Sequence, residues 1–203
     1  PLNSEELEQT GGAPYMVAVL NGDVDNHADI TVRHGLRIAN SITTDAKVIP
    51  AVMARHVANG VVDLGEAFRR TVAEFEGSVA IAAMSADAPD QVYLALRGSG
   101  QALYVGIGDD MFVVASEPYG VVEETTQFLR VDGETASPTG SRGQVFVLDR
   151  QKGEIYIQNR TTGNISTTPF FALPTDLFAK GVVTQNAFSF AFAPNFATTG
   201  KLY

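Results

Sequence analysis

The residues best suited to chemistry in this sequence are Asn21 and Gly22, which follow a short apolar run that begins at Val17. An apolar run that stops at Asn-Gly predicts a strand that ends in a tight turn, because glycine tolerates backbone angles that other residues cannot adopt. Such a turn presents a side-chain amide and a backbone N–H next to each other. Two adjacent donors can stabilise the oxyanion that develops on a carbonyl group under attack, so this pair indicates acyl-transfer chemistry.

A carboxylate that could complete such a site lies further along the chain, at Asp45. Its negative charge could bind the ammonium group of a substrate. Asp45 also precedes an apolar-periodic stretch, and aspartate in that position is typical of a helix cap. The two interpretations are compatible, because the helix macrodipole favours an ionised carboxylate near a helix N-terminus.

Several short motifs follow Asn21-Gly22 in a single register: Asp25-Asn26-His27, Thr44-Asp45 with Val48-Ile49, Ala95-Leu-Arg-Gly-Ser99 and Phe112-Val-Val-Ala-Ser116. An Asn-Gly pair alone is a common turn. Together with these motifs, over residues 13–135, it resembles the class II, or N-terminal nucleophile, glutamine amidotransferases. The resemblance is strongest to the glutaminase domain of the glucosamine-6-phosphate synthase type, although Glu117 stands where that family has an aspartate.

The resemblance implies the glutaminase half of an amidotransferase, which hydrolyses glutamine to glutamate and ammonia for transfer to a sugar phosphate. In that family, fructose 6-phosphate becomes glucosamine 6-phosphate on a sugar-phosphate isomerase domain. The resemblance assigns the oxyanion to the Asn21 amide and the Gly22 N–H, and the glutamine ammonium to Asp45 and the Gly22 carbonyl. It implies no cofactor, and it implies a homodimer.

One part of the family's site has no counterpart in this sequence. The family's nucleophile is a cysteine at the mature N-terminus, and the chain contains no cysteine. The family's Arg-Trp-x-Thr-His segment, which holds the glutamine carboxylate, is also absent, and Pro1-Leu-Asn resembles the stretch just before the Asn-Gly strand. We therefore expect a domain that is incomplete at its N-terminus, a nucleophile on a missing N-terminal segment, and no activity from this chain alone.

Two other interpretations share the same fold. In one, the chain is a degenerate, non-catalytic amidotransferase-like module that regulates a partner. In the other, it is a glutaminase domain that serves a different ammonia acceptor, because nothing in the sequence itself indicates a sugar-phosphate site.

Composition narrows the class of protein. The chain has 203 residues, 45% of them hydrophobic, which suits one folded domain, or one domain with an appendage. A net charge of −9 and a pI of about 4.7 argue against a nucleic-acid or acidic-membrane partner, and no apolar run reaches the ~20 residues of a membrane span. His27, His34 and His56 form no recognised ligand motif, so no metal is expected. We expect a cytoplasmic location.

Apolar spacing predicts helices over residues 26–39, capped by Asp25 or Asn26, from residue 43 or 44 onward with a bend at Pro50, and over 64–75. Short β-patterned runs predict strands over residues 15–20, 78–84, 91–96, 102–105, 111–114, 127–131, 144–148 and 154–157. Helices followed by many short strands favour an α+β fold. The family resemblance implies a four-layer αββα sandwich of two antiparallel sheets.

The last part of the chain has a different composition. Residues 1–158 are expected to form the partial amidotransferase domain, and residues 159–203 an aromatic-rich tail or linker. Seven of the twelve phenylalanines lie there: Phe170, Phe171, Phe178, Phe188, Phe190, Phe192 and Phe196. Because so aromatic a stretch is costly to expose, we expect it to pack on a neighbouring domain or subunit, or on the sandwich itself.

Overall fold

The structure is a computed structural model that describes residues 16–61, 63–107, 112–136, 142–149, 154–157 and 171–172. Its helical segments are α2 (His27–His34), the 3-10 helix η1 (Asp45–Lys47), α3 (Val48–Ala58), α4 (Leu64–Ala73) and the short α5 (Tyr119–Val122). Its strands are β1 (Met16–Val24), β2 (Gly77–Ser85), β3 (Ala88–Arg97), β4 (Tyr104–Ile107), β5 (Phe112–Ala115), β6 (Phe128–Arg130), β7 (Gln144–Asp149), β8 (Glu154–Ile157) and β9 (Phe171–Ala172).

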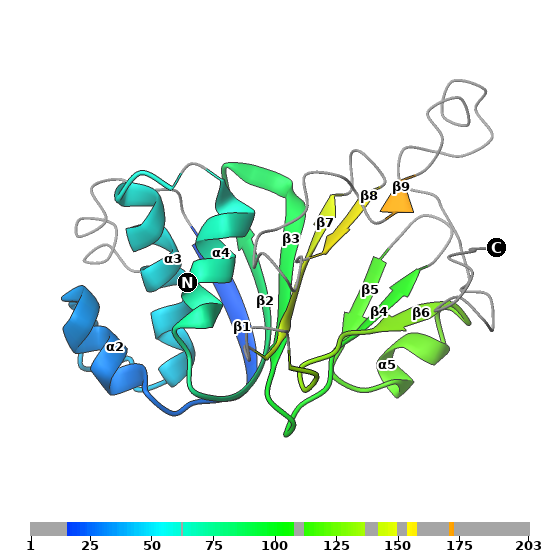
Figure 1. Ribbon diagram of the computed structural model, residues 1–203, viewed down its shortest axis with the longest axis horizontal. Coiled ribbons are helices and arrows are strands. Elements are labelled where there is room, and N and C mark those ends of the chain that lie inside the picture. The colour runs from blue at the N-terminus through cyan, green and yellow to red at the C-terminus, as the bar shows by residue number, and fades with distance from the viewer. Residues whose placement is uncertain are drawn as a thin grey trace.

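These strands form two antiparallel sheets that pack face to face. The larger sheet has the order β1-β2-β3-β7-β8-β9 and the smaller sheet the order β5-β4-β6. Helices α2, α3 and α4 lie on the outer side of the larger sheet, and α5 lies against the smaller sheet (Figure 1). The predicted α+β sandwich, with helices outside two antiparallel sheets, is confirmed.

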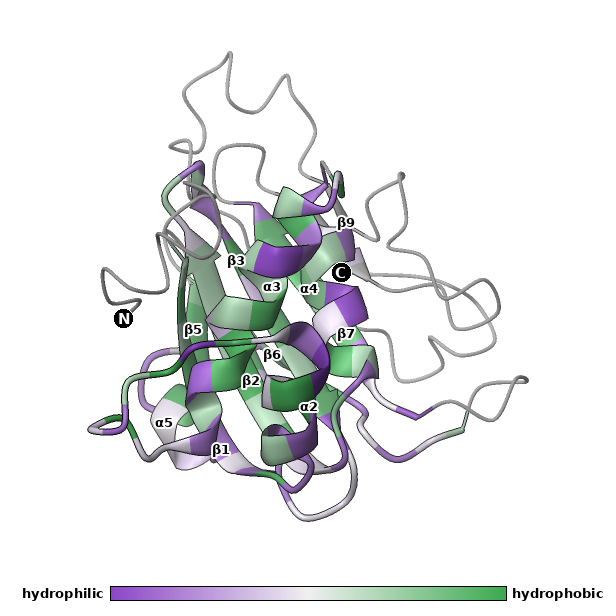
Figure 2. Cartoon of the chain, turned by 90° about the vertical axis from the view of Figure 1, so that its left-hand side faces the viewer, coloured by the Kyte–Doolittle hydropathy of each residue, from purple (hydrophilic) through white to green (hydrophobic). Residues whose placement is uncertain are grey.

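Alternation along the central strands gives the larger sheet a core on each face. Val79 and Ile81 of β2 are fully buried in the cluster that includes α3 and α4, whereas Ala80 between them is buried against the smaller sheet. Successive side chains of a strand point to opposite faces, so a strand covered on both sides must be apolar throughout. Hydrophobic residues accordingly dominate the strands that lie behind the helices (Figure 2).

The first strand differs from its prediction at the residues that matter most. The strand does not end in a turn at Asn21-Gly22 but continues to Val24. Pairing with β2 persists through this stretch, with Asn21 opposite Ala80, Gly22 opposite Val79 and Val24 opposite Gly77. The tight-turn prediction is therefore wrong, because the freedom of Gly22 is used inside a paired strand.

The helices begin near their predicted positions, but two of them differ in extent or shape. α2 ends at His34 rather than near residue 39, because Gly35 takes a left-handed conformation (φ 60°) and its N–H closes onto the Val32 carbonyl at 3.1 Å. Pro50 falls in the first turn of α3, where a missing N–H breaks no helical hydrogen bond, so the predicted bend has no physical cause there.

The third helix follows its predicted pattern. The Asp63 carboxylate accepts a hydrogen bond of 2.6 Å from the Glu66 N–H, which caps the start of α4. Phe68, Val72 and Phe75 are buried as their spacing predicts. α4 ends at Ala73, and Gly77, with φ 102°, begins β2 after the turn formed by residues 74–76.

The predicted strands from residue 78 to 157 correspond to β2 through β8, and α5 was not predicted. β9 pairs with β8 and lies within the predicted tail. The docking of residues 159–203 on a neighbouring domain or subunit stays a prediction, because apart from residues 171–172 it falls outside the described residues. Over the described ranges, no helix has the length and apolar content needed to cross a membrane.

Candidate active site

Asn21 and Gly22 lie near the end of β1, which is the outermost strand at one side of the larger sheet as described. Asn21 is exposed and Gly22 is half-buried. Residues directly opposite each other on paired strands share a face of the sheet. Because Ala80 opposite Asn21 belongs to the core between the sheets, the Asn21 side chain projects toward that inner side.

The backbone at Gly22 accepts no side chain. Its φ of 109° lies in the region that favours glycine. A Cβ at this position would collide with the Ser78 carbonyl oxygen and would lie 3.0 Å from Cγ of Gln101. Without a side chain, Gly22 can keep its backbone close to β2, and no Cβ covers its N–H and carbonyl groups.

Asp45 reaches the end of β1 from the start of the α3 region. Its Oδ2 accepts a hydrogen bond of 2.7 Å from the Val24 N–H, and its Oδ1 accepts one of 2.9 Å from the Ala46 N–H. Asp45 is the first residue of η1, and the formal cap position is Thr44, whose side chain makes no capping bond. The structure thus brings Asp45 beside β1, two residues beyond Gly22, and also uses it at a helix start.

The bond to Val24 also indicates where the Gly22 N–H points. In an antiparallel ladder the N–H groups of successive residues alternate between the partner strand and the opposite side. The Val24 N–H points to Asp45 instead of β2. Gly22 lies two residues earlier on the same strand, so its N–H is expected on the same edge as the Asp45 carboxylate.

Asn26 joins the chain after β1 to the turn between α4 and β2. It is 9% exposed, its Nδ2 donates to the Glu74 carbonyl at 2.9 Å, and its Oδ1 accepts from the Glu76 N–H at 3.0 Å. The Asp25 N–H adds a bond of 3.0 Å to the Glu76 carbonyl. Asn26 occupies the cap position of α2 as predicted, but its side chain makes no capping bond. Sequence reasoning missed its bonds to this turn.

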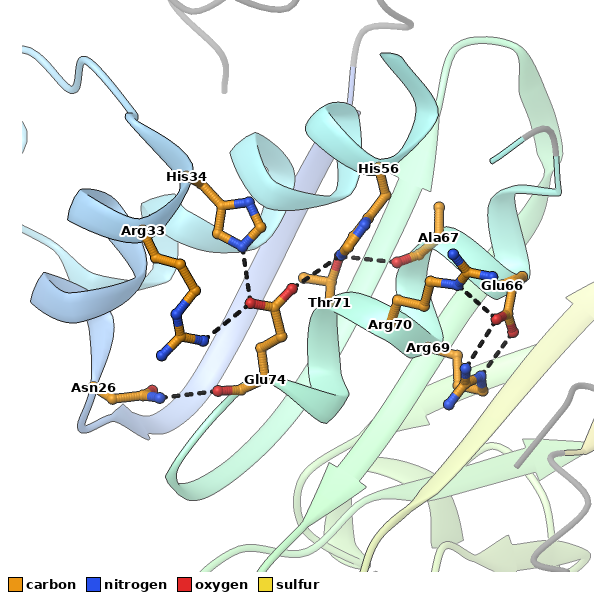
Figure 3. A network of polar contacts seen from close by, with 10 residues as sticks. All are labelled: Asn26, Arg33, His34, His56, Glu66, Ala67, Arg69, Arg70, Thr71 and Glu74. Atoms are coloured by element: carbon orange, nitrogen blue, oxygen red, sulfur yellow. Dashed lines mark hydrogen bonds and ion pairs between the residues drawn. The ribbon is translucent and has the colours of Figure 1, made fainter. Parts of the chain in front are cut away.

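The Glu74 side chain is the centre of a polar cluster that joins three helices (Figure 3). Its Oε2 lies 2.8 Å from Nε2 of His34 and 3.2 Å from Nη1 of Arg33, both in the last turn of α2. Its Oε1 lies 3.1 Å from Nε2 of His56 on α3. The two imidazole rings meet edge to face, with centroids 5.9 Å apart. We call these four residues the Glu74 cluster.

Burial and the attraction between opposite charges shift the pKa values in the Glu74 cluster in opposite directions. Burial alone would raise the pKa of the Glu74 carboxyl, but the bonds and charges of His34, His56 and Arg33 outweigh it and lower that pKa. Desolvation lowers the pKa of His56, despite the attraction of Glu74, and His34 and Arg70 add to the lowering. The lowered pKa of His56 favours its neutral form at pH 7, and Arg33 supplies a permanent positive charge. Within the described residues, no group of three or more His, Cys, Asp or Glu is arranged to hold a metal ion.

Acidification should destabilise the fold through His56. Its folded-state pKa lies below the ordinary value of 6.5, so between the two values the unfolded chain binds more protons. The stabilisation is present above pH 6.5 and is lost as the pH falls through the folded-state pKa. The urea midpoint should therefore decrease from pH 7.5 to pH 5.5. His56→Gln keeps a donor toward Glu74 without a titrating ring and should flatten this decrease, and an unchanged slope would contradict the assignment.

A polar pocket of about 200 Å³ lies on the same face of the larger sheet as the Asn21 side chain. It is lined by Leu96, Gly98, Gln101 and residues 130–135. Leu96 lies in the same cross-strand row as Asn21, with the small Ala80 between them. Gln101 links the pocket to Gly22, which it approaches closely. No sequence motif indicates this pocket, because its walls come from separate segments.

Comparisons with known proteins extend the resemblance. No protein-family profile matches the chain. Over 113 residues it is 33% identical to glutamine–fructose-6-phosphate aminotransferase (isomerizing) of Bacillus thuringiensis subsp. konkukian, covering 56% of this chain and 18% of that protein. Over 149 residues it is 32% identical to the same enzyme of Bacillus licheniformis, covering 73% of this chain and 24% of that protein. The chain thus spans about a quarter or less of these relatives.

The fold of this chain is also similar to that of a solved structure. The glutamine phosphoribosylpyrophosphate amidotransferase from B. subtilis, complexed with ADP and GMP, superposes with a TM-score of 0.56 at 20% sequence identity. The match covers 74% of this chain and 30% of the other. At this identity the likeness concerns the fold, and it agrees with the sandwich of two antiparallel sheets described above. On sequence and fold together, the chain carries a class II glutamine amidotransferase domain with the N-terminal nucleophile hydrolase fold.

Proposed function

We propose that this chain is part of the glutaminase half of a glutamine-dependent amidotransferase, which hydrolyses the side-chain amide of glutamine to glutamate and ammonia. The observation that carries the proposal is the position of the Asp45 carboxylate, bonded to the Val24 N–H beside Gly22. It puts a negative charge two residues along β1 from Gly22, which together with Asn21 is proposed to bind the oxyanion. That arrangement suits a substrate with an ammonium group and an amide to be attacked.

Three residues of this chain act in the proposed reaction, and Gly22 acts through both its N–H and its carbonyl. A thiolate attacks the amide carbon of glutamine, and the Asn21 side-chain amide and the Gly22 N–H hold the oxyanion of the tetrahedral intermediate. The Gly22 carbonyl and Asp45 bind the α-ammonium. Although both Asp45 oxygens already accept a backbone bond, a carboxylate offers about four lone-pair sites, so it can still receive an ammonium.

The thiolate must come from outside this sequence, which has no cysteine. We call this chain together with the segment that carries the nucleophile the complete enzyme. The chain alone should be inactive. Because the curated relatives are named for glutamine and fructose 6-phosphate, we propose that the ammonia passes to fructose 6-phosphate on a sugar-phosphate isomerase domain and that glucosamine 6-phosphate is the product. We also propose that the enzyme is a cytoplasmic homodimer.

A non-catalytic regulatory module is the second candidate. The observation that favours it is the same absence of cysteine. The two candidates differ in one result, since a complete enzyme that contains a thiol nucleophile should release glutamate from glutamine and a regulatory module should not.

Replacing Asp45 with asparagine tests the ammonium contact. Asparagine has one acceptor oxygen where the two Asp45 oxygens each accept an N–H, so one backbone bond is lost at a cost of about 1 kcal/mol. In the complete enzyme, the removal of the charge should raise KM for glutamine and lower glutamine-dependent turnover at least tenfold. Supplying ammonia directly should restore product formation. Near-normal glutamine turnover in Asp45→Asn would contradict the ammonium contact.

A further inference from the structure

We propose that Asn26 is a positioning residue for the Gly22 oxyanion donor, an inference that rests on the proposed function. Asn26 does not reach the substrate site itself. Its carboxamide instead fixes the chain segment that carries Gly22 against the turn between α4 and β2, and so sets where the Gly22 N–H points.

The first reason is that Gly22 has no side chain with which to hold its own position. Its donor must therefore be oriented by the bonds of its neighbours. On the edge of β1 that faces away from β2, the Val24 N–H donates to the Asp45 carboxylate at 2.7 Å. Just beyond Val24, the Asp25 N–H is bonded to the Glu76 carbonyl at 3.0 Å. The end of β1 is thus held from two sides.

The second reason is the burial and two-sided bonding of Asn26. With 9% of its surface exposed, it donates to the Glu74 carbonyl (Figure 3) and accepts from the Glu76 N–H, so both halves of one planar amide are bonded to the same turn. A buried amide that is fully bonded resists rotation, because leaving either group unpaired is costly. It therefore fixes the direction in which the chain leaves β1.

The third reason is that the turn is itself anchored. The Glu74 carboxylate is held by Arg33 and His34 of α2 and by His56 of α3, at 3.2, 2.8 and 3.1 Å. The Glu74 carbonyl that receives the Asn26 amide belongs to the same residue. The anchor of Asn26 is therefore tied to two helices besides its own turn.

Asparagine suits this position because the turn requires one donor and one acceptor. Aspartate keeps the acceptor for the Glu76 N–H but has no proton for the Glu74 carbonyl, and it adds a negative charge beside that oxygen. Asn26→Asp thus removes one defined bond and leaves the other in place.

The test compares Asn26→Asp with Asp63→Ala in the complete enzyme. Asp63 caps the other end of α4 and is a matched control, since its loss destabilises the same helix without reaching β1. Urea midpoints give the folded fraction of each variant, and glutamate release from glutamine gives kcat and KM. We expect kcat of Asn26→Asp to fall at least tenfold with a smaller change in KM, while Asp63→Ala stays within about twofold of wild type, since small misplacements of a catalytic group are costly.

One further variant completes the test. If Asn26→Asp does not fold, Asn26→Ser removes the bonds without the charge and should show the same loss of kcat. Turnover that follows only the folded fraction, as in Asp63→Ala, would overturn the positioning role. A wild-type complete enzyme without glutaminase activity would instead overturn the proposed function.

Discussion

Replacing Asn21 with alanine should lower glutamine-dependent turnover of the complete enzyme by about 10²–10³-fold, the usual loss for one oxyanion donor. The Asn21 side chain is exposed near the end of β1, so its truncation should change the free energy of unfolding by no more than about 0.5 kcal/mol. The measurement is glutamate release at saturating glutamine, with a urea titration of each variant.

Two controls separate oxyanion stabilisation from general damage. Asn21→Asp keeps the size of the side chain but removes the donors and adds a negative charge, so it should lose at least as much activity as Asn21→Ala. Synthesis from added ammonia should be retained in both variants. An Asn21→Ala enzyme within a few-fold of wild type would remove Asn21 from the mechanism.

Replacing Gly22 with alanine should destabilise the fold more than the same substitution at a left-handed glycine that has free space around it, such as Gly60. The new Cβ would meet the Ser78 carbonyl oxygen, and φ of 109° is unfavourable for alanine. Left-handed strain of about 1–2 kcal/mol and overpacking of about 1–3 kcal/mol together give an expected loss of roughly 3 kcal/mol. The urea midpoint of the variant measures it.

Gly60 provides the matched control for this substitution. Its φ is 95°, close to that of Gly22, but nothing lies within 4 Å of where its Cβ would be. Gly60→Ala should therefore carry only the backbone strain, about 1 kcal/mol. Equal losses at the two glycines would mean that the contact between Gly22 and Ser78 does not restrict that position.

The strands and helices were predictable because their signals are local. The spacing of Phe68, Val72 and Phe75 indicates the buried face of α4 and of the turn that follows it. The runs that form β2 through β8 alternate or are apolar throughout. The prediction failed at Asn21-Gly22, where a turn-like pair lies inside a paired strand. The strand continues through Asn21-Gly22 because β1 pairs with β2 there, and the residues near Gly22 in the sequence do not indicate this pairing.

The candidate site was predictable only in part. The motifs of the family pointed to Asn21, Gly22 and Asp45, and the structure brings Asp45 to β1, but their catalytic roles stay predictions. The bonds of Asn26 join residues 48 and 50 positions apart, and the Glu74 cluster joins three helices. Such contacts follow from the packing of distant segments, so no local pattern of the sequence reveals them.

Glutamate release from glutamine, measured on this chain alone and on the complete enzyme, tests the central claim most directly. The account predicts no release above the uncatalysed rate from the chain alone, and clear turnover by the complete enzyme that Asn21→Ala largely abolishes. Turnover by the cysteine-free chain, or a complete enzyme that contains the thiol and does not hydrolyse glutamine, would contradict it.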